Sequence, residues 1–278
     1  MRKTKRTLTA RLTLAICLFA ASEAIPDVPL VWTPELIHTA LRSGNPEYNG
    51  AAQFQIDAGK VVGLQLTATG VTDLSPLQGM GIQGLDLRGI QIEDLSALKD
   101  EPLVQLFLED TQVVDLAPLA GKQLMTLYLG GTGVKDLSPL VGMPLETLNL
   151  LGTPVSDLGP LQGMPLKSLW LNETFARDIS PLSGCPLVTL TLHRTQVSDL
   201  SPLSGIETLE RLHIGETPVT DLTPIAGLAL TRLIFTSERI ERGFDDIRAM
   251  TTLRELGPTL EKRYSPANYW RLYDAKTK

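Results

Sequence analysis

The sequence contains few of the side chains on which enzymes rely. It has three histidines and two cysteines among 278 residues, and aromatic residues make up 5% of the chain. It has no HExxH, GxSxG, P-loop or CxxC motif. These motifs place metal ligands, nucleophiles and phosphate-binding loops, so the usual signals of a metalloprotease, a serine hydrolase or a dithiol oxidoreductase are missing. We therefore expect a non-catalytic protein with no catalytic residue, no cofactor and no metal.

The start of the chain predicts export. Five basic residues between Arg2 and Arg11 are followed by an apolar run from Leu12 to Ala21 and then by the tripeptide Ser22-Glu23-Ala24. These are the parts of a signal peptide, so we predict that residues 1–24 are cleaved off. An uncleaved membrane anchor is one alternative, although ten apolar residues are too few to span a bilayer. Lipid attachment through Cys17 is the other, although this cysteine lies inside the apolar run.

Beyond the apolar run the chain has no second hydrophobic segment of membrane-spanning length. We expect the mature protein to be exported, periplasmic or secreted, monomeric and without a membrane span. Cleavage removes five basic residues and one acidic residue, which changes the net charge from −6 to about −10. Such an acidic chain is a poor general ligand for nucleic acid. It keeps one cysteine, Cys185, which stands where other turns have Met143 and Met164 and is interpreted as a small core residue.

A repeat of 21 residues dominates the chain between residues 61 and 240. An aspartate marks each period, and a leucine of the predicted strand recurs at the same spacing. A fixed period of 20–29 residues with this leucine pattern is typical of a solenoid of stacked turns. The aspartates are Asp73, Asp94, Asp115, Asp136, Asp157, Asp178, Asp199 and Asp221.

One turn, Leu145–Pro165, shows what each position does. Leu148-Asn149-Leu150 alternates apolar and polar residues, which is typical of a short strand with one buried face. Thr153 belongs to a column of threonines that is broken by Ile90. We expect the threonine hydroxyls to form hydrogen bonds with the neighbouring turn. The Asp-Leu-Ser-Pro-Leu segment found in most turns joins a capping residue to proline. This pattern predicts one turn of 3₁₀ helix on the opposite face.

The aspartate column has two interpretations. Eight carboxylates one turn apart suggest calcium ligands. However, each aspartate comes two residues before a Ser, Thr, Ala or Gly in a tight turn, where aspartate normally bonds the nearby backbone. We favour capping, because no second oxygen ligand recurs with the column.

The two ends of the repeat should be capped, since a solenoid otherwise exposes its core. We assign residues 25–60 to an N-terminal cap, with a helix beginning at Thr33-Pro34-Glu35 and ending at Gly44, and a strand containing Phe54 and Ile56. We assign residues 241–278 to a C-terminal cap of one or two short helices. The alternative is that this aromatic-rich segment is a separate binding module, but it is too small to hold a hydrophobic core alone.

With these residues in view, the chain resembles the bacterial leucine-rich-repeat proteins, and among them the internalin-like class with repeats of 21–22 residues. The resemblance covers residues 61–240, which is about nine repeats. It implies an α/β fold in which a right-handed solenoid has a parallel β-sheet on its concave face, 3₁₀ turns on its convex face and helical caps. The flanks NPEYNG and LRELG…PANYWRLYDA also resemble those of exported planctomycete and verrucomicrobial repeat proteins.

The outward strand positions are the candidate binding surface. Phe107, Tyr128 and Trp170 take the middle position of predicted strands that lie within three turns of one another. Aromatic residues dominate the energetics of protein interfaces, so we predict that these three bind a partner. The alternative is that the three rings stack on one another and only shield the sheet. A charged cluster further along the same face completes the predicted site, and it consists of His193, Arg194, Arg211, His213 and Arg232.

Two functions fit these residues. The first is a protein-binding scaffold that uses both the aromatic and the charged positions and is therefore sensitive to salt. The alternative is a glycan or cell-wall binder that uses mainly Tyr128 and Trp170. The identity of the protein partner does not follow from the residues.

Overall fold

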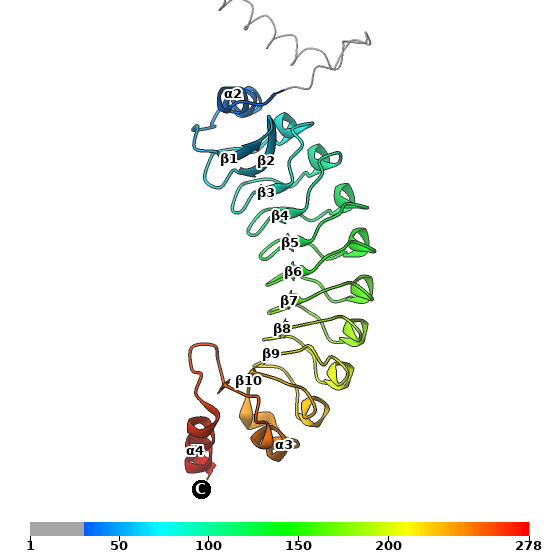
Figure 1. Cartoon of the computed structure of the whole chain (residues 1–278), viewed down its shortest axis with the longest axis vertical. Coiled ribbons are helices and arrows are strands. Elements are labelled where there is room, and N and C mark those ends of the chain that lie inside the picture. Colours follow the sequence, from blue (N-terminus) through cyan, green and yellow to red (C-terminus); the bar gives the residue numbers. More distant parts are fainter. Residues whose placement is uncertain (1–30, 278) are drawn as a thin grey trace, which may run out of the picture. The chain divides into compact units, whose positions relative to one another are not determined.

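The computed structural model describes residues 31–277, so the predicted signal peptide lies outside the described residues. Residues from Trp32 onward form one compact unit. Its strands follow one another in a single stack, and its 3₁₀ helices lie on the opposite side (Figure 1). Within this unit the strands line the concave side and the 3₁₀ helices line the convex side.

Within residues 31–277 the strands form one 11-stranded sheet whose spatial order equals the order in the chain. β1 and β2 pair as an antiparallel hairpin, and each later pair is parallel. Parallel neighbours need a crossover, which here is the remainder of each turn. The strands are β1 (Gln53–Asp57), β2 (Lys60–Gln65), β3 (Gly84–Asp86), β4 (Gln105–Phe107), β5 (Thr126–Tyr128), β6 (Thr147–Asn149), β7 (Ser168–Trp170), β8 (Thr189–Thr191), β9 (Arg211–Ile214), β10 (Arg232–Phe235) and β11 (Glu255–Gly257).

The recurring leucine of each strand forms a buried column through the unit, as the repeat predicts. Leu127, Leu148 and Leu169 are direct partners on successive strands, and all three are fully buried. Each turn covers its apolar side chains only with those of its neighbours, so burial between turns is the main source of stability.

The capping interpretation of the aspartate column is confirmed. In a representative turn, Asp136 Oδ1 accepts a hydrogen bond from Ser138 N at 2.8 Å, and Oδ2 accepts one from Ser138 Oγ at 2.9 Å. These bonds hold the pKa of Asp136 below its usual value. The 3₁₀ helices that the column introduces are Ser75–Leu77, Ser96–Leu98, Ala117–Leu119, Ser138–Leu140, Gly159–Leu161, Ser180–Leu182, Ser201–Leu203 and Thr223–Ile225. A further one, Ser237–Arg239, follows β10.

The threonine column is buried, but its hydrogen bonds differ from the prediction. Thr153 Oγ1 donates to the Leu150 carbonyl at 2.7 Å, which lies in its own turn and not in the neighbouring one. Its equivalents Thr132 and Thr174 do the same at 2.6 and 2.7 Å. The column therefore closes the bend after each strand from within.

Replacing Thr153 with valine should lower the free energy of unfolding by about 1–2 kcal/mol, because the hydroxyl bond is lost while the side-chain shape is kept. Chemical denaturation monitored by circular dichroism measures the change. Thr72→Val is the matched control, because Thr72 is exposed and its hydroxyl makes no hydrogen bond in the described residues. Equal losses in the two variants would show that the bond does not contribute.

A buried carboxylate and a buried amine interrupt the core on the convex side. Glu101 and Lys122 are 3% and 9% exposed and occupy the position taken by methionine in other turns. Glu101 accepts hydrogen bonds from the backbone N–H groups of Gly79, Gly81 and Ile82 at 2.5, 2.9 and 2.8 Å. Lys122 Nζ donates to the carbonyl of Glu101 at 2.7 Å, and burial lowers the pKa of this amine.

The backbone segment that binds Glu101, Gly79–Gly84, also matches the GxGxxG pattern. In a dinucleotide-binding loop this string follows a strand and opens a helix. Here it follows a 3₁₀ helix and leads into β3, and its N–H groups bind the carboxylate of Glu101. The string is therefore part of the stacking of turns.

The N-terminal helix forms where the sequence predicts it. α2 (Pro34–Gly44) begins after Thr33, whose hydroxyl accepts from Leu36 N at 3.4 Å. The side chain of Asn45 then joins α2 to the first turn: its Oδ1 accepts from the backbone N–H groups of Thr72 and Asp73, each at 2.8 Å. One buried amide thus fixes the helix over the open end of the core.

The C-terminal end contains one element that the sequence analysis missed. The expected short helices are α3 (Phe244–Ala249) and α4 (Pro266–Thr277), but β11 lies between them and adds a further parallel strand next to β10. In this region Tyr269 and Trp270 are buried and lie 5.8 and 6.0 Å, between ring centroids, from Phe235 and Phe244. These aromatic residues therefore cover the end of the core.

The sheet register, the buried leucine column and the 3₁₀ turns define a leucine-rich-repeat solenoid. Among residues 31–277, none of the helices combines the length and the apolar character needed to cross a lipid bilayer.

Candidate functional site

The predicted aromatic residues come together on the outward face of the sheet. Phe107 and Tyr128 are direct partners on β4 and β5, with ring centroids 5.1 Å apart in an edge-to-face arrangement. Trp170 lies two strands beyond Tyr128, yet the centroids are 5.9 Å apart because the smaller Asn149 stands between them. We call Phe107, Tyr128 and Trp170 the aromatic stripe. All three are half-buried, so each ring contacts the next and still presents surface to solvent.

Charged side chains border the aromatic stripe at its N-terminal end. The guanidinium carbon of Arg88 lies 5.6 Å from the centroid of Phe107, and Arg88 Nη2 is 2.6 Å from Asp86 Oδ2. Glu109 Oε2 is buried and has no hydrogen-bond partner within the described residues, and burial raises the pKa of this carboxyl.

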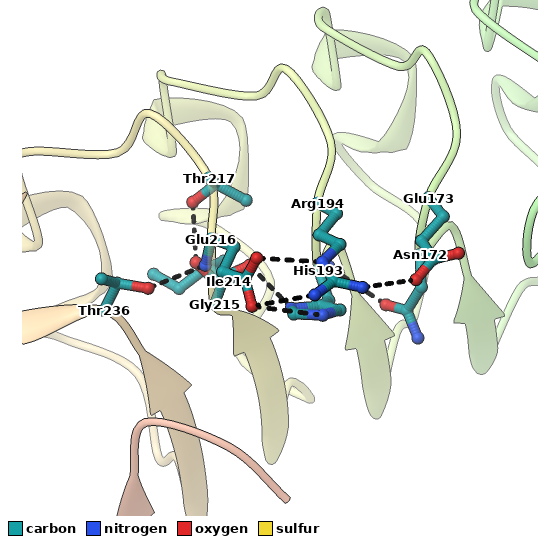
Figure 2. Close-up of polar contacts among 9 residues, drawn as sticks. All are labelled: Asn172, Glu173, His193, Arg194, Ile214, Gly215, Glu216, Thr217 and Thr236. Atoms are coloured by element: carbon teal, nitrogen blue, oxygen red, sulfur yellow. Dashed lines mark hydrogen bonds and ion pairs between the residues drawn. The ribbon is translucent and has the colours of Figure 1, made fainter.

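A ladder of alternating charge borders the C-terminal half of the sheet (Figure 2). Arg194 Nη1 lies 3.1 Å from Glu173 Oε1 in the preceding turn, and Arg194 Nε lies 2.9 Å from Glu216 Oε2 in the following turn. The hydrogen bond from Arg194 lowers the pKa of Glu216. The predicted site residue Arg194 thus has two acidic partners on the chain itself.

The three ladder residues hold an unusual backbone conformation. Their φ angles are 60°, 56° and 56°, where turns nearer the N-terminus have Gly89, Gly131 and Gly152. A side chain in this left-handed region costs roughly 1–2 kcal/mol. The mutual ion pairs partly offset this cost, and they keep charged groups at the edge of the concave face.

The two predicted histidines stack, but they differ in accessibility. His193 and His213 have ring centroids 4.8 Å apart at an interplanar angle of 21°. His193 Nδ1 lies 3.0 Å from the Gly215 carbonyl, which fixes a proton on that nitrogen (Figure 2). His213 is only 7% exposed, and neither ring nitrogen has a partner within the described residues. Burial lowers the pKa of His213 to about 4, so the ring is neutral at pH 7.

The burial of His213 differs from the open position that the sequence analysis assumed, and it has a local cause. The Lys262 carbonyl occupies the space directly above Gly257, so the loop of residues 258–263 crosses the outward side of β11. Ile234, the outward residue of β10, is fully buried, and the carboxylate of Glu261 acts electrostatically on His213. The loop therefore covers the C-terminal end of the concave face.

Arg211 and Arg232 are direct partners on β9 and β10, as expected from the repeat. Arg211 Nε donates to Thr189 Oγ1 at 2.9 Å, and its Nη1 lies 3.6 Å from Glu210. Arg232 forms a short ion pair with Glu255 of β11, a residue outside the repeat. Local partners thus neutralise both arginines, and an anionic ligand is not required to hold them together.

The structure therefore divides the predicted residues into two groups. The aromatic stripe is open, whereas His213 is covered and the charged cluster is largely paired within the chain. Among residues 31–277, no group of three or more His, Cys, Asp or Glu side chains is placed to hold a metal ion.

Comparisons with known proteins support the repeat class. No protein-family model matches the chain, and no curated protein matches its sequence. Among solved structures, internalin C2 of Listeria monocytogenes is 26% identical with a TM-score of 0.61, and the match covers 77% of this chain and 100% of that one. The chain is thus similar in fold and sequence to a bacterial internalin.

Two more distant structures show the same fold. The functional domain of the Listeria monocytogenes protein InlJ, which includes a cysteine ladder, is 20% identical with a TM-score of 0.52, over 70% of this chain and 43% of that one. The leucine-rich-repeat ectodomain of the Arabidopsis thaliana receptor kinase GASSHO1/SCHENGEN3, solved with CASPARIAN STRIP INTEGRITY FACTOR 2, is 16% identical. Its TM-score is 0.61, over 87% of this chain and 32% of that one.

Proposed function

We propose that this chain is an exported, non-catalytic leucine-rich-repeat scaffold that binds a protein partner through its concave face. The aromatic stripe carries the proposal. The core of each turn is filled by aliphatic side chains, so the stacking of turns does not need rings at these outward positions. Rings that hold one another in place lose little freedom on binding, and such residues dominate protein interfaces.

The surroundings of the stripe favour a protein over other partners. Arg88 and Asp86 lie at one end of it, and the ion-paired Glu173 and Arg194 belong to the turn of Trp170 and the turn after it. A polar, charged rim around an aromatic centre is typical of a protein interface. The plant ectodomain solved with a bound factor has the same fold. Export, the periplasmic or secreted location, the monomeric state and the likeness of the flanks to planctomycete and verrucomicrobial proteins stay predictions.

The test compares the mature chain, residues 25–278, with a Phe107→Ala/Tyr128→Ala/Trp170→Ala variant as baits for proteins of the envelope and medium of the source organism. Each buried aromatic anchor contributes about 2 kcal/mol or more, so the variant should bind at least about 100-fold more weakly. Val141→Ala is the control, because Val141 is a 62% exposed apolar residue just after a 3₁₀ helix of the convex side.

A protein that is retained by the wild type and the control, released by salt and lost with the triple variant would support the proposal. Retention of the same proteins by all three baits would contradict a role for the stripe. Salt-insensitive retention of cell-wall polysaccharide would instead favour the glycan-binding alternative.

A further inference from the structure

A second outward surface lies beside the aromatic stripe, at the N-terminal end of the concave face. It is a shallow hollow of about 370 Å³ formed by β1, β2, β3 and β4. Gly63 and Gly84 are direct partners at its centre, whereas the later turns carry Gln, Thr, Ser or Arg at this position. A side-chain atom added at Gly84 would meet nothing closer than 3.8 Å. The hollow therefore exists because two successive turns lack a side chain there.

Four glutamine side chains surround this glycine floor. Gln53 and Gln55 lie on β1 at one side of the two glycines, and Gln65 of β2 is the direct partner of Gln53. Gln105 of β4 lies at the opposite side. None of their amides has a hydrogen-bond partner within residues 31–277. Each free amide offers two N–H donors and one carbonyl acceptor, so the hollow presents both kinds of group around a flat floor.

The remaining lining residues set the charge and shape of the ligand. Asp86 is the ionisable residue among those lining the hollow, and Arg88 binds its carboxylate at 2.6 Å, so the hollow has no free charge. Phe107, the first residue of the aromatic stripe, forms one wall of the hollow. A fully buried small ligand usually needs a deeper site, whereas a shallow hollow suits one unit of a longer chain.

We infer that this hollow binds one ring of an uncharged saccharide chain. Sugar hydroxyls both donate and accept hydrogen bonds, which matches primary amides and a carboxylate. The apolar face of a sugar ring can lie on glycine backbone and against Phe107. A peptide fits less well, because the backbone groups of these central strands already pair within the sheet. The hollow shares only Phe107 with the aromatic stripe, and the inference does not depend on the proposed protein partner.

The test titrates the full chain with maltotriose, cellotriose and triacetylchitotriose, and separately with the uncharged tripeptide acetyl-Gly-Gln-Gly-amide, using saturation-transfer NMR. Gly84→Thr fills the hollow with the residue that β5, β6 and β8 carry at this position. Ser168→Thr is the matched control, because it adds a methyl group at the same position of β7, outside the hollow. Trp170→Ala distinguishes binding in the hollow from binding on the aromatic stripe.

We expect at least one trisaccharide to bind, with an affinity at least tenfold lower in Gly84→Thr and unchanged in Ser168→Thr and Trp170→Ala. Loss of saccharide binding in Trp170→Ala with retention in Gly84→Thr would overturn the assignment to the hollow. Binding of the tripeptide alone, or of none of the four probes, would overturn the saccharide class. Circular dichroism of each variant confirms that it is folded.

Discussion

Replacing Glu101 with alanine is expected to lower the free energy of unfolding by about 3–5 kcal/mol, a large part of the stability of an ordinary domain. The carboxylate accepts from three backbone N–H groups and is 3% exposed, so its removal leaves donors without a partner. Lys122 would lose nearby negative charge at the same time. Urea denaturation at pH 7 measures the loss.

Glu101→Gln is the control for the acceptor role. Glutamine keeps one side-chain oxygen, so this variant should lose about half as much stability or less. Glu101→Met introduces the residue that other turns carry at this position. Its loss of stability should be close to that of the alanine variant, because sulfur is a weak hydrogen-bond acceptor. If alanine and glutamine cost the same, the hydrogen bonds to the carboxylate do not hold these turns together.

Stability is expected to fall as the pH is lowered from about 6.5 to about 4, with His213 as the cause. The folded protein holds this ring neutral, with a pKa of about 4, whereas the unfolded chain protonates it near the ordinary value of 6.5. Between these values the unfolded state binds more protons, so acid favours unfolding. The shift corresponds to about 3 kcal/mol over the window, with no further loss from this group below pH 4.

The His213→Phe variant should remove this dependence while still stacking on His193. Free energies of unfolding measured at pH 4, 5, 6 and 7.5 would give a smaller slope for the variant than for the wild type. The capping aspartates do not obscure the comparison: hydrogen bonding holds the pKa values of residues such as Asp136 and Asp178 below the usual 3.8. Their stabilising contribution is therefore lost below that value. Identical slopes would contradict the assignment to His213.

The repeat itself could be predicted from the sequence because each turn buries the same apolar positions and caps its 3₁₀ helix with the same aspartate. The leucine and aspartate columns fix which side chains face the core and where each 3₁₀ helix begins, and both were confirmed. β11 was missed because it follows its predecessor after 23 residues instead of 21 or 22. Leu253 and Leu256 do repeat the spacing of Leu230 and Leu233, and this was a usable signal.

The candidate site was harder to predict, because it depends on contacts from outside the period. The burial of His213 comes from the loop of residues 258–263, and the partner of Arg232 is Glu255, which lies beyond the repeat. The acidic partners of Arg194 do lie inside the period. They take the left-handed position that Gly89, Gly131 and Gly152 fill in three other turns, so consecutive charged residues at this position were the signal for the ladder.

The sequential order of the strands also has a kinetic and evolutionary consequence. Because each strand pairs only with those adjacent in the chain, most contacts join residues about one turn apart. Such a chain can begin folding at any turn and grow outward from it, without waiting for its ends to meet. Gain or loss of a complete turn by duplication or deletion then lengthens or shortens the concave face while leaving the other turns intact, so the binding surface can diversify one turn at a time.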